Sequence, residues 1–368
     1  SIGGWINAII PILIVPYYSV IGGWVIKYLI EYFAGHSKTL AGDAYFTTFI
    51  SNGWSTEICF IIFTLFTLGI IYAGVRNGIE RVSKFMMPIL IVLSLIIAVY
   101  SVTRPGAIEG VKYFLVPNFD HFSWMTVVSA MGQMFYSLSI AMGILITFGS
   151  YMKKDTSIEK STENVEIFDT AIAIMAGLMI IPAVFAFSGG NAETLKSGPA
   201  LMFITIPKVF ANMGFGTAIG VVFFLLVLFA AVTSSIALTE SAVSTFEDEL
   251  HWSRKKSTVF MGMVMLLLGT LSCLGYGPLA NFKILGMQFL DFFDFITNSV
   301  MMPIAAIATC LLVSKVVGVD KIEEEIKKDG QAFRRKKIFC FMIKYLCPLF
   351  AAIILISSVA NAFGIITM

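Results

Sequence analysis

The stretch FGTAIGVVFFLLVLFAAVTSSIALTESAVST, residues 215–245, decides the fold class of this chain. Its 31 residues contain one charged side chain, Glu240. A helix needs about 20 apolar residues to cross roughly 30 Å of bilayer hydrocarbon. The stretch therefore predicts a helix that spans a membrane.

The whole chain has the composition of a protein that is surrounded by lipid. Of its 368 residues, 58% are hydrophobic and 13% are charged, and its mean hydropathy is +0.88. Globular proteins carry about 25% charged residues. We predict an all-α, polytopic membrane protein in which residues 1–368 form a single integral membrane domain. The nine predicted spans cover residues 6–32, 56–74, 85–103, 124–150, 166–188, 215–245, 257–275, 285–314 and 339–361.

The remaining composition excludes several other classes of function. The net charge of +2 is too small for a nucleic-acid-binding surface. The five cysteines lie in or beside apolar runs without CxxC spacing, and no HExxH, GxSxG or P-loop sequence occurs. We therefore expect no enzyme activity, no nucleic-acid partner and no resident cofactor.

Basic residues alternate between the predicted loops. The loops after the second, fourth, sixth and eighth spans hold 17 Lys and Arg, whereas the opposite loops hold six. Cytoplasmic loops retain Lys and Arg. This predicts a multi-pass protein of the cell membrane, plasma or bacterial inner, with the Ser1 end in the cytoplasm and the Met368 end outside. The external loop at about 190–214 contains FITIPKVFAN (203–212), which predicts a short helix that acts as a lid or merely covers the bundle.

Several ionisable groups fall where the bilayer would be. Such groups are costly at membrane depth and indicate function, and Asp169, Glu240 and Asp294 are of this kind. Asp169 fits cation binding, a proton relay or a buried structural hydrogen bond. Asp294 also fits a position at the membrane interface.

Two segments contain small and hydroxyl residues at bilayer depth. GQMFYSLSIAMG (132–143) fits either a broken helix beside a binding site or close packing between helices. Thr233, Ser234 and Ser235 fit either oxygen ligands for a hard cation such as sodium or hydrogen bonds between helices. The residues alone leave both interpretations of each segment open.

Six blocks, taken in order, resemble the neurotransmitter:sodium symporter family, in particular its bacterial amino-acid transporters. The resemblance runs from Gly4 to the last span. The blocks are PYYSVIGGW (16–24), NGIERVSKFMMP (77–88), GQMFYSLSIAMG (132–143), DTAIAIMAGLMIIPAVFAF (169–187), TSSIALTESAVSTFEDEL (233–250) and LDFFDFITN (290–298).

The resemblance implies two inverted repeats of five helices, with the substrate and two sodium ions at unwound points of the family's first and sixth helices. The nine spans match the family's third to eleventh helices, and its first two helices have no counterpart here. Because those helices would supply half of each sodium site, we expect an incomplete sequence whose full-length parent transports. The alternatives are a truncated, non-transporting scaffold or regulatory subunit, and a chain that a second fragment completes.

The resemblance also assigns roles to individual residues. Tyr18 would meet the substrate carboxylate, and Tyr136 would cover the substrate. The implied substrate-binding residues are Ile14, Tyr18, Tyr136, Ser137, Ser139, Met142, Ser234 and Leu238. The implied sodium ligands are Ser137 and Asp169 at one site, and the Ala230 carbonyl, Thr233 and Ser234 at the other. The implied gating residues are Asp294 on the outside, and Asp248 and Tyr151 on the inside.

The implied function is symport of sodium with a neutral, hydrophobic or aromatic amino acid. Asp169 stands where chloride-dependent relatives carry Asn, so its carboxylate would supply the negative charge that chloride provides there. We therefore expect chloride independence. The remaining alternative is a proton-coupled amino-acid transporter of the same fold, in which Asp169 would act alone.

Overall fold

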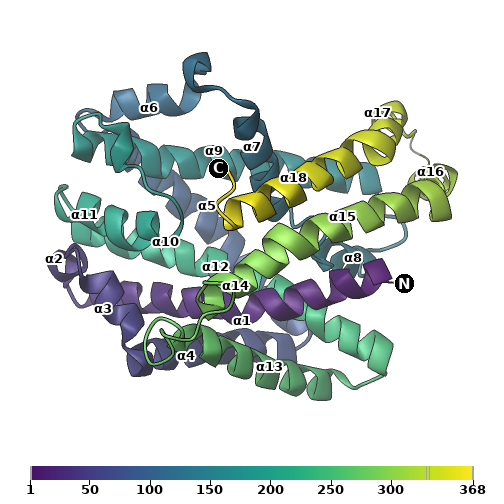
Figure 1. Cartoon of the computed structure of the whole chain (residues 1–368), viewed down its shortest axis with the longest axis horizontal. Coiled ribbons are helices and arrows are strands. Elements are labelled where there is room, and N and C mark those ends of the chain that lie inside the picture. The colour runs from purple at the N-terminus through teal and green to yellow at the C-terminus, as the bar shows by residue number, and fades with distance from the viewer. Residues whose placement is uncertain (1, 329, 331, 367–368) are drawn as a thin grey trace.

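The computed structural model describes residues 2–328, 330 and 332–366, and almost all of them lie in helices (Figure 1). Within this described part, the only β-type pairing is an isolated bridge between Ile284 and Met287. The predicted all-α class is confirmed.

Eight helical segments of the described chain are long and apolar enough to cross a membrane, judged by length and composition. Each of them matches one predicted span. Their bounds are α1 Ile2–Phe33, α4 Gly53–Tyr72, a segment Val75–Val102 that contains α5 Arg81–Val102, α9 Ile158–Ser188, α12 Gly216–Leu250, α13 Arg254–Leu274, Phe289–Val317 and Lys336–Ala362.

The predicted span at 124–150 is not continuous. It consists of α7 Trp124–Ser137 and α8 Ile144–Ser150, and residues 138–143 between them are not helical. The nine predicted spans are therefore present as eight continuous helices and one broken helix. Of the two interpretations of GQMFYSLSIAMG, the broken helix is the one observed.

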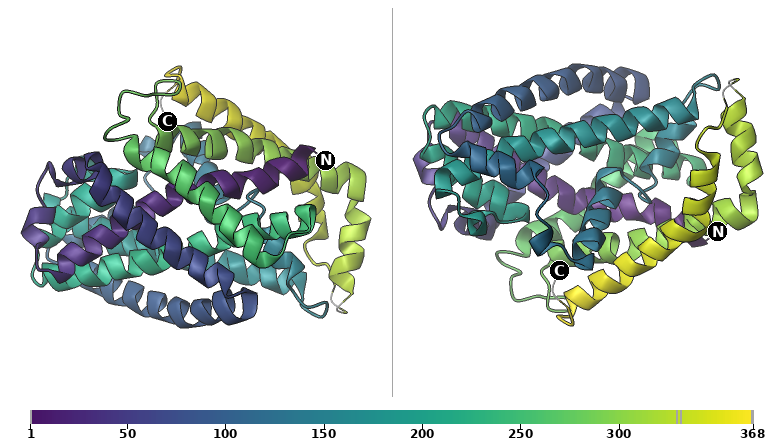
Figure 2. Two further views of the ribbon diagram at one scale, coloured as in Figure 1. Left: turned by 90° about the horizontal axis from the view of Figure 1, so that it is seen from below. Right: turned by 90° about the horizontal axis from the view of Figure 1, so that it is seen from above.

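Shorter helices lie at the two ends of the bundle (Figure 1). α16 Val319–Lys327 lies at the end that holds the N-terminus. The opposite end carries α2 Ser37–Leu40, α3 Tyr45–Ser51, α6 Ala107–Leu115, η2 Phe119–His121, η3 Ala192–Thr194, α10 Gly198–Ala200, η4 Leu201–Thr205 and α11 Ile206–Ala211. In Figure 2 the long helices run roughly from one of these ends to the other.

The helical loop at 192–211 is packed into the bundle. Phe203, Ile206 and Phe210 are each 1% exposed, and the Tyr28 hydroxyl donates a hydrogen bond of 2.8 Å to the Phe203 carbonyl. The Lys208 ammonium forms an ion pair with Asp43, and this hydrogen-bonded cation lowers the pKa of the Asp43 carboxyl. This burial favours a covering role over that of a loose lid.

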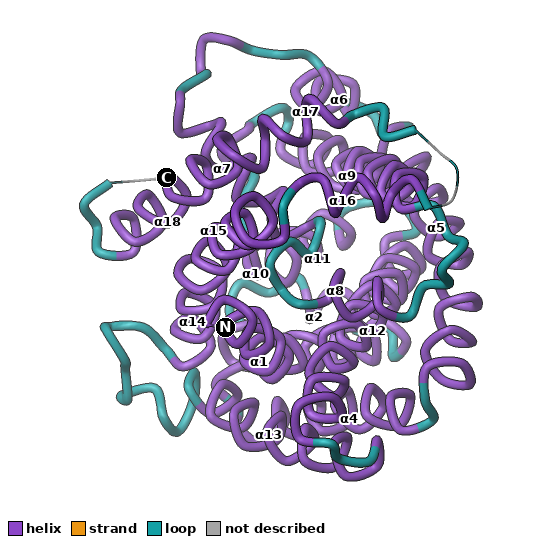
Figure 3. Tube along the Cα trace, turned by 90° about the vertical axis from the view of Figure 1, so that its right-hand side faces the viewer, coloured by secondary structure: helices purple, strands orange, loops and turns teal. Residues whose placement is uncertain are grey.

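α1 and α12 form the centre of the bundle, and they contact each other along much of their length. In the end-on view of Figure 3, α4 and α13 lie below this pair and α9 lies above it. Gly23 lets α1 approach α4 closely, because a Cβ at this position would lie 2.7 Å from the Phe60 backbone nitrogen.

Two prolines lie inside α1 without ending it. Proline has no backbone N–H, so Pro11 and Pro16 cannot bond the carbonyls four residues earlier. The carbonyls of Asn7 and Ile12 therefore lack their usual helical donors.

Five helical segments of the described chain contain wide, π-type turns. In such a turn each N–H bonds to a carbonyl five residues earlier, so the turn holds one residue more than an α-helical turn. The wide turns are η1 Val75–Glu80, η4 Leu201–Thr205, η5 Phe295–Met301, η6 Leu312–Val317 and η7 Met342–Leu346. η5 joins α14 Phe289–Asp294 to α15 Met302–Leu311, and η7 joins α17 Lys336–Phe341 to α18 Cys347–Ala362.

Candidate functional site

The break between α7 and α8 is the most irregular backbone at bilayer depth. Ser139, Ala141 and Gly143 have φ angles of 55°, 60° and 73°. A residue with a Cβ pays about 1–2 kcal/mol for this left-handed conformation, and such strain is concentrated at functional sites. Non-helical backbone is tolerated in a membrane only where protein or a water-filled cavity surrounds it.

A hydroxyl and a carboxylate meet at the break. The Ser137 Oγ donates a hydrogen bond of 2.6 Å to Asp169 Oδ1, which reaches across from α9. Ser137, the last residue of α7, is exposed, and Asp169 is half-buried, so both remain accessible. The two residues predicted for one sodium site are thus adjacent, although they are 32 positions apart in the sequence.

The three consecutive hydroxyl residues of α12 have different surroundings. The Thr233 hydroxyl donates hydrogen bonds of 3.0 Å to the carbonyls of Phe229 and Ala230. Ser234 is exposed, and its side chain lies close to that of Tyr18 of α1. Ser235 is fully buried. Its hydroxyl lies 3.1 Å from that of Thr67 in α4, so Ser235 forms a hydrogen bond between helices. A cation-binding role stays a prediction for Thr233 and Ser234.

The predicted apolar pocket residues are buried. Ile14, Met142 and Leu238 are 0%, 3% and 4% exposed, and they belong to one contiguous hydrophobic cluster. Tyr136 packs against this cluster and lies near Tyr18 and Asp294. Ser139 is half-buried inside the break.

Asp294 has a tyrosine partner that the sequence did not predict. The Tyr17 hydroxyl donates a hydrogen bond of 3.1 Å to Asp294 Oδ1. It also lies 3.4 Å from the Thr297 hydroxyl and accepts a hydrogen bond of 3.4 Å from Asn298 Nδ2. Tyr17 is 2% exposed. Tyr17 thereby links α1 to the segment that begins with α14.

Asp248 lines a cavity of about 750 Å³ at the end of the bundle that holds the N-terminus. We call it the Asp248 cavity. Its walls come from the start of α1, from α8, from the last turns of α12, and from α15 and η6. Among the residues that the structure describes, neither Asp248 nor Asp294 forms an ion pair.

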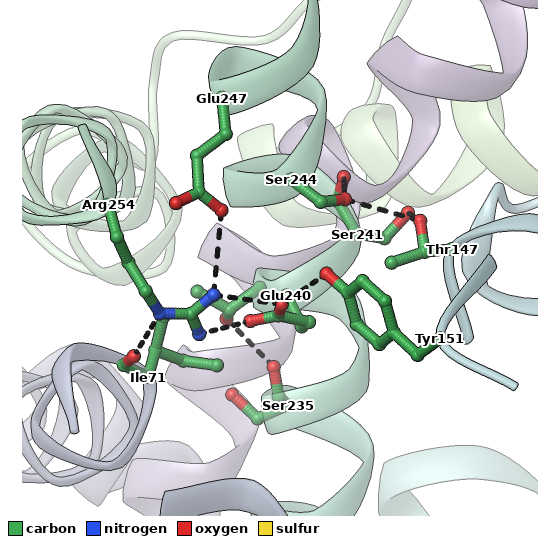
Figure 4. Close-up of polar contacts among 10 residues, drawn as sticks. Ile71, Thr147, Tyr151, Ser235, Glu240, Ser241, Ser244, Glu247 and Arg254 are labelled. Atoms are coloured by element: carbon green, nitrogen blue, oxygen red, sulfur yellow. Dashed lines mark hydrogen bonds and ion pairs between the residues drawn. The ribbon is translucent and has the colours of Figure 1, made fainter. Parts of the chain in front are cut away.

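Glu240 is the centre of a buried ionic network (Figure 4). Its side chain is 0% exposed. The Arg254 guanidinium donates hydrogen bonds of 3.0 Å and 2.5 Å to its two oxygens, and the Tyr151 hydroxyl donates one of 2.6 Å. Arg254 also contacts Glu247 at 3.5 Å and donates to the Ile71 carbonyl at 2.9 Å. Tyr151, which was predicted to lie near the inner gate, is thereby fixed against α12.

The Arg254–Glu240 pair was missed from the sequence. Glu240 stood out as an ionisable group inside an apolar run, but Arg254 looked like one of several basic residues of a loop. Arg254 is instead the first residue of α13. The turn between α12 and α13 brings it back onto Glu240, 14 positions earlier.

A bundle of long apolar helices, with one helix broken beside hydroxyl and carboxylate side chains, defines a membrane protein of the secondary-transporter type. A family model described as "Sodium:neurotransmitter symporter family" matches residues 46–365. The chain belongs to this family of sodium-dependent transporters, which is not a class of enzymes.

Curated relatives agree with this assignment. The chain is 32% identical to an uncharacterized sodium-dependent transporter, YhdH, of Bacillus subtilis, over 99% of the chain and 80% of that protein. It is 30% identical to an uncharacterized sodium-dependent transporter of Haemophilus influenzae, over 94% of the chain and 76% of that protein.

A solved structure supports the fold. The structure of MhsT in complex with L-phenylalanine matches with a TM-score of 0.85 at 32% identity, over 97% of this chain and 81% of that chain. The polytopic transporter fold inferred from the sequence is therefore confirmed, with sodium as the coupling ion of the family.

Proposed function

We propose that the protein is a sodium-coupled symporter of neutral, hydrophobic or aromatic amino acids in the cell membrane. The observation that carries this proposal is the position of the broken helix. On one side of the break Ser137 contacts Asp169, and Tyr18 of α1 lies close to Ser234 of α12. Hydroxyl, carbonyl and carboxylate oxygens suit a hard monovalent cation.

The proposed sodium sites follow these contacts. Ser137 and Asp169 contribute to the first site. The Ala230 carbonyl, Thr233 and Ser234 contribute to the second site. Thr233 already lies 3.0 Å from the Ala230 carbonyl, so two of the three oxygens of the second site are adjacent.

Chloride independence is proposed from the charge of Asp169. A carboxylate beside the sodium ligand Ser137 supplies a fixed negative charge within 2.6 Å of that hydroxyl. A permanent charge at this point removes the need for a bound anion to balance the sodium ions.

The proposed substrate class follows from the pocket. Ile14, Met142 and Leu238 form a buried apolar surface, and Met adapts to ligands of different shape. The Tyr18 hydroxyl is proposed to bind the substrate carboxylate, with Tyr136 above it and Ser139 beside it. Phenylalanine, the ligand of the MhsT structure, has the chemistry that such a pocket accepts.

The same proposal assigns the gate residues and the orientation of the protein in the membrane. Asp294 is the proposed external gate residue, and Asp248 and Tyr151 are the internal ones. The end of the bundle where α1 begins, with the Asp248 cavity, then faces the cytoplasm, and the end where α18 finishes faces outward.

A binding assay tests the proposal. It measures the sodium-dependent binding of radiolabelled neutral amino acids to the purified protein, expressed from its complete coding region. We expect saturable binding of phenylalanine or leucine that requires sodium and is unaffected when gluconate replaces chloride. Thr233→Ala with Ser234→Ala should abolish the sodium dependence. Binding that follows pH rather than sodium would favour proton coupling through Asp169. No binding under any of these conditions would favour a non-transporting scaffold.

A further inference from the structure

The carboxylate of Asp294, the proposed external gate residue, is held from one side only. The Tyr17 hydroxyl of α1 donates a hydrogen bond of 3.1 Å to Asp294 Oδ1. Asn298, four positions further along the segment Phe289–Val317, donates a second hydrogen bond to the same oxygen. Asp294 Oδ2 accepts no hydrogen bond from the residues that the structure describes. One oxygen of the carboxylate is therefore held in place, and the other is left without a protein donor.

Tyr17 is fixed by its packing. Its side chain is 2% exposed and belongs to the contiguous hydrophobic cluster of the bundle. α1 packs against α4, α12 and α13, so the ring is held by the centre of the bundle. A buried hydroxyl needs a hydrogen-bond partner. The Tyr17 hydroxyl finds its partners on the segment that carries Asp294.

The surrounding hydrogen bonds direct the Tyr17 hydrogen atom to Asp294. A hydroxyl has one hydrogen atom to donate. Thr297 donates its own to the Phe293 carbonyl at 2.7 Å, and its oxygen lies 3.4 Å from the Tyr17 hydroxyl. Asn298 Nδ2 donates to the Tyr17 hydroxyl at 3.4 Å. Asp294 Oδ1 is the nearer acceptor of the two open to Tyr17, and hydrogen bonds to ionised acceptors are the stronger ones.

This arrangement lies beside the proposed substrate site. Tyr136, which is proposed to cover the substrate, lies near Asp294 and near Tyr18. Tyr18, which is proposed to bind the substrate carboxylate, follows Tyr17 directly in α1. Successive side chains of a helix point about 100° apart. Two neighbouring tyrosines of α1 therefore serve two places, one in the substrate pocket and one at the gate.

A carboxylate that is already oriented loses less conformational entropy when it acquires a further partner. With Oδ1 of Asp294 held by Tyr17 and Asn298, a cationic group that approaches from outside meets Oδ2 in a fixed position. No Lys, Arg or His of the described chain pairs with Asp294. Oδ2 is thus the oxygen that remains for a charge-assisted hydrogen bond.

We propose that Tyr17 is a positioning residue of the external gate, which holds the Asp294 carboxylate through Oδ1 so that Oδ2 receives the cationic group that closes the gate. This inference rests on the proposed function, because it adds a residue to the gate of that function. Tyr17 is a ligand neither of the substrate nor of sodium in this proposal. Its hydroxyl therefore sets how long the substrate is retained.

The release of radiolabelled phenylalanine measures this effect, with purified protein that is expressed from its complete coding region and saturated with sodium. Tyr17→Phe removes only the hydroxyl and should speed release about fivefold, which corresponds to about 1 kcal/mol. The association rate should stay unchanged, because the open gate is not altered. Tyr32→Phe is the matched control on the same helix. The Tyr32 hydroxyl is buried and has no partner in the described structure, so its loss should not change release.

Asp294→Ala distinguishes positioning from packing. In this background the Tyr17 hydroxyl has no carboxylate to hold, so Tyr17→Phe should not speed release any further. Asn298→Ala, which removes the other donor to Asp294 Oδ1 and leaves α1 intact, is a second variant and should also speed release. Thermal unfolding of each preparation checks that the variants are folded.

The outcomes separate this inference from the proposed function. Unchanged release in Tyr17→Phe, with normal sodium-dependent binding, would overturn the inference alone. Equal acceleration by Tyr17→Phe with and without the Asp294 carboxylate would make Tyr17 a packing residue and would also overturn it. Absence of sodium-dependent binding in the unaltered protein would reject the proposed function, and the inference with it.

Discussion

The two segments that carry the proposed sodium ligands present their oxygen atoms in opposite ways. Between α7 and α8 the chain leaves the helical conformation, and Ser139 and Ala141 take left-handed φ angles. α12 continues for 35 residues and presents Thr233 and Ser234 from an intact helix. The first segment places side-chain oxygens beside backbone that has left the helix, and the second offers side-chain hydroxyls and the Ala230 carbonyl from an intact helix.

This difference separates a deformable element from a fixed one. The break stores strain, and few backbone hydrogen bonds have to change when it moves. α12 is held in place by the Arg254–Glu240 pair and by the hydrogen bond between Ser235 and Thr67. A cation at the first proposed site would therefore draw the break toward Asp169 of α9, while α12 would keep its conformation. The following predictions test this contrast.

Loss of the buried carboxylate on α12 should have the largest effect. Glu240→Ala leaves the Arg254 guanidinium without its main partner, and breaking a buried pair in this way costs about 3–5 kcal/mol. The apparent free energy of unfolding, measured by titration with a denaturing detergent, should fall by this amount. Lys84→Ala, which breaks an exposed pair with Glu80, is the control and should have little effect. Equal effects of the two variants would contradict the fixed role of α12.

Loss of charge at the break should have the second-largest effect, a loss of sodium affinity. Asp169→Asn keeps an acceptor for Ser137 but removes the negative charge, and hydrogen bonds to charged groups contribute about 1.5–3 kcal/mol. We expect sodium affinity to fall more than tenfold, with part of it restored by chloride. Sodium titrations of amino-acid binding, in chloride and in gluconate, measure both effects. Asp291→Asn is the control, because the Asp291 carboxylate belongs to neither proposed sodium site and accepts a hydrogen bond of 3.0 Å from the Tyr276 hydroxyl. An unchanged sodium affinity would remove Asp169 from the site.

A methyl group at the break should destabilise it. Gly143→Ala places a Cβ in the left-handed conformation at about 1–2 kcal/mol and within 2.9 Å of the Asn7 carbonyl oxygen. Gly132→Ala lies inside α7, where a Cβ meets nothing within 4 Å, so it should stabilise by about 0.5–1 kcal/mol. Thermal unfolding in detergent compares the two variants. A change of the same sign in both would show that the break is not strained.

Loss of one hydroxyl on α12 should have the smallest effect. Thr233→Val keeps the shape of the side chain, removes one proposed ligand, and should lower sodium affinity by about 1 kcal/mol, or about fivefold. Stability should stay within about 0.5 kcal/mol, because the helix does not depend on this hydroxyl. Sodium-dependent binding and thermal unfolding of the same preparation give both numbers. A loss of stability that exceeds the loss of affinity would make Thr233 a structural residue.

The sequence predicts those parts of the molecule that depend on local composition. Apolar length identifies the spanning helices, because the bilayer fixes how many residues a span needs. The glycines and serines of 132–143 mark a weak point of the span but do not decide that it breaks, because small residues also let two helices pack closely. The pairing of Ser137 with Asp169 could be predicted as well, although only from a resemblance that places both residues in one site.

The sequence does not predict contacts that depend on how helices pack. The partner of Glu240 is set by the turn that follows α12. Tyr17 and Tyr18 are chemically identical and adjacent, and only the packing of α1 shows that Tyr17 is the one that contacts Asp294. The wide turns have no residue type in common, so no pattern of hydrophobicity or glycine predicts them.

The wide turn η5 follows Asp294 directly and carries one residue more than a regular helical turn. If that surplus residue moved by one position along the chain, the residues it passed would rotate by about 100° and advance by about 1.5 Å. The ends of the span Phe289–Val317 would keep their hydrogen bonds during such a step. A shift of the wide turn by one position toward α14 would therefore rotate Asp294 away from Tyr17, while the helix on either side of the wide turn stayed intact.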